Sequence, residues 1–391
     1  MSRAYRVSFI EGDGIGPEIF SSARSVLETL AECYPNFNFE FIPTPAGDAT
    51  LAKMGEALPK DSFIKITESD LCLKAPVGET ARETIIKLRQ ELDLFANIRP
   101  ARNYDFIESR FRGVDLVIVR ENTEDLYVGR EFEEQDGKRA TALKVTTEKA
   151  SKRIAKVAFE TALSRTRSQK ENQTPSVVCV QKSNVLPVTD GLFMRSCTSV
   201  ASNYPAIKYS TMYVDTAAMN LVRNPESFDV IVTSNVYGDI LSDEASQIVG
   251  GLGLAGSANL GNEFALFEPV HGCAPDIAGK GVANPLSMIF AVKMMLDWLG
   301  MKRNDHNCTS AAQLLDQAVS STGSDGVLTP DIGGKSSTLE VTRAICKSIR
   351  DRNEGKEGDQ KSNYDSNGNS KMTKRETVNT GTGKQDVLLR W

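Results

Sequence analysis

Histidine is scarce in this chain, with only two among 391 residues, and the seven cysteines form no Cys-x-x-Cys pair. A catalytic triad or metal site built on histidine, or a zinc site built on paired cysteines, is therefore a poor hypothesis. An odd number of scattered cysteines is typical of reduced thiols. We therefore expect a cytoplasmic protein without disulfides.

Long apolar runs and blocks of positive charge are also missing. No stretch is long enough to cross a bilayer, and the first residues lead straight into a strand-like segment, Val7–Ile10, so we expect no signal peptide and no membrane partner. The net charge is −5, which argues against a nucleic-acid partner. With 40% hydrophobic and 25% charged residues, the composition is that of a soluble globular protein long enough for two domains.

The most informative stretch is 235–244, which reads Asn-Val-Tyr-Gly-Asp-Ile-Leu-Ser-Asp-Glu. It follows the apolar run Val230–Thr233, which predicts a buried strand, and it opens a segment with apolar residues at helical spacing. Asp239 and Asp243 share one face of that helix, where like charges repel unless a cation such as Mg²⁺ or Mn²⁺ neutralises them. A third carboxylate, Asp215, follows another predicted strand. The plain alternative is a solvated acidic face.

Near the start, the predicted strand Val7–Ile10 runs into a loop containing Gly12, Gly14 and Gly16, followed by a helix. The spacing is G-x-G-x-G and then proline, so the third glycine of the dinucleotide fingerprint is missing. The pattern therefore predicts a tight turn that brings backbone close to a ligand, and not a Rossmann fingerprint.

Several basic side chains stand at predicted element ends. Arg89 lies on the predicted helix 82–92, Arg99 follows the strand 94–98, and Arg120 follows the strand 114–119. Guanidinium groups grip carboxylates bidentately, so this set favours a substrate with more than one carboxylate, although surface salt bridges are the plain alternative. Lys182 follows the buried strand 176–181, where a lysine with a lowered pKa is plausible.

The remaining elements are expected as follows. The segment 127–147 predicts a hairpin arm that pairs with a second subunit. Further strands are predicted at 37–43, 71–75 and 207–214, and further helices at 148–164, 216–221, 284–299, 310–321 and 338–349. Connections without secondary structure are predicted at 165–175 (a polar loop), 250–261 (glycine-rich) and 266–279 (a long loop). The composition of 350–391 predicts a disordered tail.

With these pieces in place, the chain resembles the isocitrate/3-isopropylmalate dehydrogenase family of β-decarboxylating dehydrogenases. Four motifs carry the resemblance, in order, between about residues 7 and 349: 11–18, 120–127, 235–243 and 268–279. The resemblance implies an α/β, isopropylmalate dehydrogenase-like fold that is not a Rossmann fold. It has two α/β domains about a large mixed twisted sheet, formed by 1–98 plus 252–349 and by 99–251. It also implies a homodimer with shared active sites.

The same resemblance implies roles for the candidate residues. Arg89, Arg99 and Arg120 bind the carboxylates of a hydroxy-acid substrate. Asp239 and Asp243, with Asp215 from the second subunit, hold Mg²⁺ or Mn²⁺, and Asp215 also borders the substrate. Tyr127 and Lys182, the latter from the second subunit, serve as acid and base.

The helix that carries Arg89 selects the substrate in this family. Relatives that act on isocitrate place serine and asparagine on its inner face, whereas this chain has Glu83, Ile85 and Ile86. The isoleucines suit an isopropyl group and offer nothing to a carboxylate. This favours 3-isopropylmalate, converted to 4-methyl-2-oxopentanoate in leucine biosynthesis. Isocitrate, homoisocitrate, D-malate and tartrate stay open.

The coenzyme is indicated by Asp276 and Ile277, where NADP-using relatives have lysine and tyrosine. An aspartate accepts hydrogen bonds from ribose hydroxyls and repels a 2′-phosphate, so we expect NAD. The resemblance implies that the rest of the coenzyme pocket is formed by Glu268, His271, Gly272, Ala274 and Asn284.

Two other classes of function compete with an active dehydrogenase. One is a non-catalytic regulatory subunit, which keeps the fold but loses metal or acid–base residues. The other is a nucleotide-binding module without chemistry. Both are disfavoured because all five residues with chemical roles are present: Tyr127, Lys182, Asp215, Asp239 and Asp243.

Overall fold

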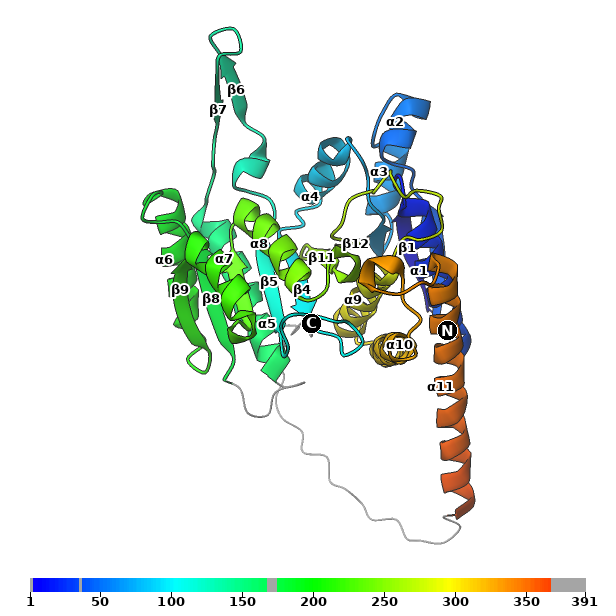
Figure 1. The fold of residues 1–391 in the computed structure, drawn as a ribbon. Coiled ribbons are helices and arrows are strands. Elements are labelled where there is room, and N and C mark those ends of the chain that lie inside the picture. Colours follow the sequence, from blue (N-terminus) through cyan, green and yellow to red (C-terminus); the bar gives the residue numbers. More distant parts are fainter. Residues whose placement is uncertain (1–2, 35–36, 167–173, 367–391) are drawn as a thin grey trace.

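The computed structural model describes residues 3–34, 37–166 and 174–366. Its strands form one ten-stranded mixed sheet and a separate two-stranded hairpin (Figure 1). In spatial order the large sheet contains β2 (Phe37–Pro43), β1 (Arg3–Ile10), β3 (Leu71–Lys74), β12 (Ala265–Pro269), β11 (Gly256–Leu260), β4 (Ala96–Arg102), β5 (Asp115–Glu121), β10 (Val230–Thr233), β8 (Ser176–Gln181) and β9 (Lys208–Tyr213). The expected α/β class with a large mixed sheet is confirmed.

Helices cover both faces of this sheet. In chain order they are α1 (Gly16–Cys33), α2 (Asp48–Met54), α3 (Lys60–Thr67), a π-helical turn η1 (Arg82–Ile86), α4 (Lys87–Glu91), η2 (Leu126–Val128), α5 (Glu148–Thr166), α6 (Thr189–Ala201), α7 (Val214–Arg223), η3 (Pro225–Ser227), α8 (Asn235–Ile248), η4 (Leu252–Leu254), α9 (Leu286–Lys302), α10 (His306–Ser324), η5 (Pro330–Ile332) and α11 (Thr338–Ser366). The hairpin of β6 (Glu131–Glu134) and β7 (Arg139–Ala142) projects from the molecule, as expected for an arm (Figure 1).

The direction of the strands changes at the centre of the sheet. Strands β2, β1, β3 and β12 are mutually parallel, as are β5, β10, β8 and β9, while β11 and β4 pair antiparallel to each other and to their outer neighbours. Strands from both predicted domains therefore belong to one continuous sheet, joined through β11 and β4. The division into two domains stays a prediction.

Three apolar clusters hold the helices on the sheet. The largest packs α1, α5, α6, α9, α10 and α11 against one face. On the other face, one cluster packs α7 and α8 against β5, β8 and β10, and a second packs α3, η1 and α4 against β1, β3 and β12. These two clusters leave α4 and α8 on the same face of the sheet. The site described below lies between these two helices.

Two predicted connections are strands instead. The glycine-rich connection contains β11, because Gly256 lets α9 pack directly on the sheet: a Cβ there would lie 2.7 Å from the Ala291 nitrogen. The predicted long loop begins with β12, all of whose residues are buried. A strand buried on both faces shows no alternation and is recognised only as an apolar run. In β12 that run is interrupted by Pro269.

Helix α11 continues through Ser366, into the segment 350–391 for which we predict disorder. The disordered tail stays a prediction. The rest of that tail, 367–391, and residues 167–173 of the predicted polar loop lie outside the described residues.

The glycine loop at 12–16 packs against two segments that are distant in the chain, at Pro76 and Cys273. Gly12 and Gly14 have positive φ values of 67° and 57°, and a Cβ at either would lie 1.9 Å from a backbone oxygen, of Pro76 and Cys273 respectively. The backbone amide of Ile15 donates to that oxygen of Cys273 at 2.8 Å. The tight turn is confirmed, and what it brings close is the protein's own backbone.

Candidate active site

Arg120 is the centre of the site. It stands at the end of β5 and is completely buried. Its Nε and Nη2 donate to Oδ1 of Asn235 at 3.0 and 2.6 Å, and its Nη1 donates to Oδ1 of Asp239 at 2.5 Å. Helix α8 can approach this closely because Gly238 has no side chain: a Cβ there would lie 2.6 Å from Cγ of Arg120.

Arg99 reaches the same helix from β4. Its Nη1 donates to Oγ of Ser242 at 2.7 Å and ion-pairs with Oδ1 of Asp239 at 3.1 Å. Asp243 lies further away, with its Oδ1 3.5 Å from the same nitrogen. Two of the three predicted substrate arginines therefore converge on the two predicted metal carboxylates.

Arg89 enters from α4 and is held by Glu268. Its Nη2 lies 3.1 Å from Oε1 of Glu268, while Nζ of Lys74 lies 2.8 Å from Oε2. Burial alone would raise the pKa of Glu268, but these two cations outweigh it and lower that pKa to about 2. The Nε of Arg89 is buried and, among the described residues, has no hydrogen-bond partner.

A chain of amides links these groups beneath the site. Asn259 on β11 donates to Oε1 of Glu268 at 2.8 Å, and its oxygen accepts a hydrogen bond from Asn97 at 2.9 Å. The oxygen of Asn97 in turn accepts from Nε of Arg99 at 2.6 Å. Arg89 and Arg99 are thus positioned by one buried network that crosses β12, β11 and β4.

Tyr127, on the short helix η2, packs its ring against the guanidinium group of Arg120. Its hydroxyl donates to Oδ2 of Asp239 at 2.5 Å, and the guanidinium carbon of Arg120 lies 5.0 Å from its ring centroid. Burial, followed by the charge of Asp239 and this hydrogen bond, raises the pKa of Tyr127. The phenol therefore keeps its proton and can donate it.

The two carboxylates of α8 differ in their environments. Burial favours the neutral form of Asp239, but Arg120 and Arg99 outweigh burial and lower its pKa. The pKa of Asp243 is raised, first by burial and then by the charge of Asp239. Its side chain is about half exposed and lies 3.5 Å from Arg99, whereas that of Asp239 is less exposed and lies closer to Arg99, at 3.1 Å. Of the two carboxylates of α8, Asp243 is therefore the more open to a bound cation.

Lys182 and Asp215 form a separate pair. Nζ of Lys182 lies 2.5 Å from Oδ1 of Asp215, and this hydrogen bond lowers the pKa of Asp215. Asp215 lies in the first turn of α7, directly after β9, which ends at Tyr213. In the described part of this single chain, no three acidic, histidine or cysteine side chains are grouped to hold a metal ion. The sharing of sites between subunits stays a prediction.

The predicted coenzyme residues divide into two groups. Gly272 and Asp276 are exposed, and His271, Ala274 and Ile277 are partly exposed along the loop after β12. Asn284 is already engaged, since its amide donates to Asp331 at 2.9 Å and its oxygen accepts a hydrogen bond from the backbone amide of Leu286, the first residue of α9. Glu268 does not lie in the loop at all, and its contacts are with Arg89, Lys74 and Asn259.

The predicted substrate selectors also differ from each other. Ile85 is 8% exposed and belongs to the core cluster beneath α4, whereas Ile86 is only partly buried. Both lie in the π-helical turn η1, a feature often found at functional sites. Of the two, Ile86 offers more surface to a ligand.

Comparison with known proteins identifies the family. A family profile described as isocitrate/isopropylmalate dehydrogenase matches residues 6–348. The 3-isopropylmalate dehydrogenase of Sulfurisphaera tokodaii is 49% identical over 346 residues, covering 88% of this chain and 99% of that protein.

The chain belongs to the isocitrate/isopropylmalate dehydrogenase family.

Other members of the family are also similar. The homoisocitrate dehydrogenase of Methanocaldococcus jannaschii is 43% identical over 369 residues, covering 90% of this chain and 99% of that protein. The crystal structure of isocitrate dehydrogenase from Methylococcus capsulatus superposes with a TM-score of 0.80 at 37% identity, covering 88% of this chain and 99% of that chain. These names span three substrates within the isocitrate/isopropylmalate dehydrogenase family.

Sequence reasoning missed several polar residues of the site. Asn97, Asn259, Asn235 and Ser242 hold the arginines in place, yet none had been assigned a role. For Asn97 and Asn259 the available signal was an asparagine among apolar residues of a strand, because a buried amide needs partners. Lys74, within the predicted strand 71–75, likewise has no predicted role, yet it belongs to the buried cluster around Glu268.

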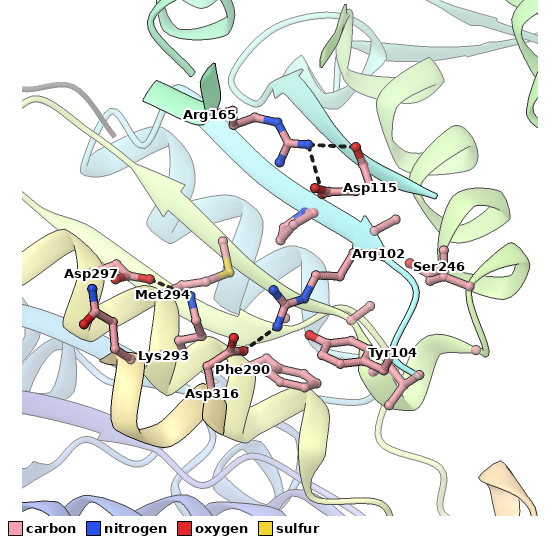
Figure 2. Close-up of a pocket in the computed structure, with 18 residues that line it drawn as sticks. Arg102, Tyr104, Asp115, Arg165, Ser246, Phe290, Lys293, Met294, Asp297 and Asp316 are labelled. Atoms are coloured by element: carbon pink, nitrogen blue, oxygen red, sulfur yellow. Dashed lines mark hydrogen bonds and ion pairs between the residues drawn. The ribbon is translucent and has the colours of Figure 1, made fainter. Parts of the chain in front are cut away.

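A cavity of about 250 Å³ lies between α9 and the β4–β5 turn, away from the candidate site of this dehydrogenase. Figure 2 shows three ion pairs in its walls, between Arg165 and Asp115, Lys293 and Asp297, and Arg102 and Asp316. The predicted site residues do not line it. The charges of these three pairs balance one another.

Proposed function

We propose that the protein catalyses the NAD- and divalent-metal-dependent oxidative decarboxylation of a (2R)-hydroxy acid, with 3-isopropylmalate as substrate and 4-methyl-2-oxopentanoate as product. The observation that best supports this proposal is the cluster of Arg89, Arg99 and Arg120. Burial and then the neighbouring charge of Arg99 lower the pKa of Arg120, so the cluster favours a bound anion. The buried, unpartnered Nε of Arg89 is a donor ready for a carboxylate oxygen.

Each residue has a definite task in this proposal. The three arginines bind and orient the two malate carboxylates, and burial of Arg120 excludes water from that contact. Tyr127, whose hydroxyl is held by Asp239, supplies a proton to the carbon that loses CO₂. Lys182 of a second copy of the chain accepts the proton of the substrate hydroxyl. Acting in a homodimer, the protein would contribute to leucine biosynthesis in the cytoplasm.

The residues of α8 fit a divalent metal. Asp239 and Asp243 offer hard oxygen donors on one helix face, and the side chain of Asp243 is about half exposed. A third carboxylate, Asp215, would come from the second copy. Mg²⁺ or Mn²⁺ held there would act as a Lewis acid on the substrate hydroxyl.

The loop after β12 fits NAD. Asp276 is exposed there, and an aspartate suits ribose hydroxyls and opposes a 2′-phosphate. NAD bound against this loop would accept the hydride. His271, Gly272, Ala274 and Ile277 are available on the same segment, whereas Glu268 is assigned here to Arg89.

The substrate assignment rests on the apolar surface of Ile86. Burying an isopropyl group gains about 0.8 kcal/mol per carbon, or roughly 2 kcal/mol over malate, whereas a third carboxylate would lose its water without gaining a donor from an isoleucine. Lys74 favours the second candidate, a tricarboxylic substrate such as homoisocitrate, but its charge is already paired with Glu268.

One assay tests the proposal directly. NADH formation is measured with isopropylmalate, D-malate, isocitrate and homoisocitrate side by side, with Mg²⁺ or Mn²⁺ present. We expect kcat/KM to fall in the order isopropylmalate, D-malate, isocitrate. Faster turnover of isocitrate or homoisocitrate would reject the substrate assignment while keeping the reaction class. The absence of NADH with all four would reject the proposed function.

A further inference from the structure

Lys144 lies outside the proposed chemistry, yet it is nearly buried among acidic groups. It stands between β7 and α5, and its side chain is 14% exposed. Its ammonium nitrogen lies 3.0 Å from Oδ1 of Asp190 and 3.3 Å from Oδ1 of Asp125. The side chains of these aspartates are 3% and 2% exposed, so one cation neutralises two buried carboxylates.

Each of these aspartates holds the backbone of a segment that carries a candidate catalytic group. Oδ2 of Asp190 accepts a hydrogen bond from the backbone amide of Lys182 at 2.7 Å. Oδ2 of Asp125 accepts one from the amide of Val236, in the first turn of α8, at 3.1 Å. Three residues after Val236, on the same helix, is Asp239.

Asp125 also fixes the loop that carries Tyr127. Its Oδ1 accepts from the amide of Leu126 at 2.9 Å, and its backbone has a positive φ of 67°, which is strained for an aspartate. The backbone of Asp125 also pairs with the segment after β7, since its amide donates to the backbone oxygen of Val145 at 2.9 Å. The ammonium of Lys144 lies 4.4 Å from the ring centroid of Tyr237, which completes its enclosure.

We propose that Lys144 is a positioning residue that sets Lys182, the first turn of α8 and the Tyr127 loop in fixed relation through Asp190 and Asp125. This inference rests on the proposed function for its kinetic consequence, but its structural part can be tested without turnover. If Lys144 is removed, two buried carboxylates lose their shared cation, and they must take up protons or water. Either change weakens their hold on the amides of Lys182 and Val236.

The test compares Lys144→Met and Lys144→Arg with a matched control, Lys149→Met. Lys149 is exposed, lies five residues further along the chain, and has no role in this network. Hydrogen exchange is followed by mass spectrometry in peptides that cover 182–185 and 234–238. We expect exchange at least tenfold faster in both peptides for Lys144→Met, partial restoration for Lys144→Arg, and no change for Lys149→Met.

The kinetic constants kcat and KM then distinguish a positioning role of Lys144 from a merely structural one. For Lys144→Met we expect kcat to fall at least tenfold and KM for NAD to change less than twofold, because the coenzyme loop lies outside the network. A folded Lys144→Met protein with wild-type exchange and kcat would overturn the inference. If the wild-type protein forms no NADH, the proposed function fails, and the exchange measurements still decide the role of Lys144.

A second variant covers the case in which Lys144→Met does not fold. Asp190→Ala removes the acceptor of the Lys182 amide and leaves Lys144 and Asp125 as a simple ion pair, so fewer buried charges are left unbalanced. We expect faster exchange at 182–185 and unchanged exchange at 234–238. Unchanged exchange in the 182–185 peptide would reject the proposal.

Discussion

The hydroxyl of Tyr127 lies 2.5 Å from Oδ2 of Asp239 and donates a hydrogen bond to it. The other oxygen of Asp239 accepts from the buried guanidinium of Arg120. One carboxylate therefore orients a proton donor and neutralises a buried cation, on the helix face proposed to hold a metal. Because these roles use different atoms and neighbours, substitutions around Asp239 should have separable consequences.

Tyr127→Phe should lower kcat about 10²- to 10⁴-fold, because it removes the proposed proton donor. KM for the hydroxy acid should change little, since Arg89, Arg99 and Arg120 keep their contacts. Steady-state kinetics with isopropylmalate check this, and Tyr34→Phe, which lies on a distant part of the fold, serves as the control. A Tyr127→Phe enzyme with wild-type kcat would remove the phenol from the mechanism.

Asp243→Asn and Asp239→Asn should both abolish metal-dependent turnover but should differ in stability. Asp243 has a half-exposed side chain, 3.5 Å from Arg99. The free energy of unfolding of its variant should therefore lie within about 0.5 kcal/mol of the wild-type value. Asp239→Asn leaves buried Arg120 without its carboxylate and should cost about 1–3 kcal/mol. Urea unfolding measures the difference. Full activity of the wild-type enzyme in excess chelator would contradict the metal assignment.

Mixing two inactive variants should restore activity if the sites are shared. Lys182→Met and Asp239→Asn proteins are combined under conditions that exchange subunits, and NADH formation is followed. If Lys182 acts in the other subunit's site, a mixed dimer contains one site free of both changes. Each mixed dimer should then have up to about half of the activity of a wild-type dimer. Exchange proven by mass spectrometry without any recovery would show that each chain is self-contained.

Stability should fall at acidic pH in a way that depends on Glu268. Its folded pKa of about 2 lies below its ordinary value, so its stabilising contribution is complete above the ordinary pKa and is lost as the pH falls. Between pH 5 and pH 3, wild type should lose about 2 kcal/mol more than Glu268→Gln does. Urea unfolding across this range checks the difference. If the free energy of unfolding falls with pH in parallel for wild type and Glu268→Gln, the prediction is refuted.

Local patterns in the sequence were enough to predict much of the fold. The strands 37–43, 176–181 and 230–233 and the hairpin arm lie where periodicity and turn residues placed them. The i,i+4 spacing of Asp239 and Asp243 on one helix was equally clear. Strands β11 and β12 were not predicted, because Gly256, Asn259 and Pro269 interrupt their apolar runs.

The sequence by itself determined the α/β class, the family motifs and the residue types of the site, because these depend on spacing along a single strand or helix. Only the tertiary structure decided that Glu268 lies under Arg89, that Ile85 belongs to the core and that Asn97 and Asn259 link the arginines. It also decided the place of Lys144 between Asp125 and Asp190. Such contacts join residues far apart in the chain. Their partners are chosen by the need of each buried charge or amide to be satisfied, which no local pattern records.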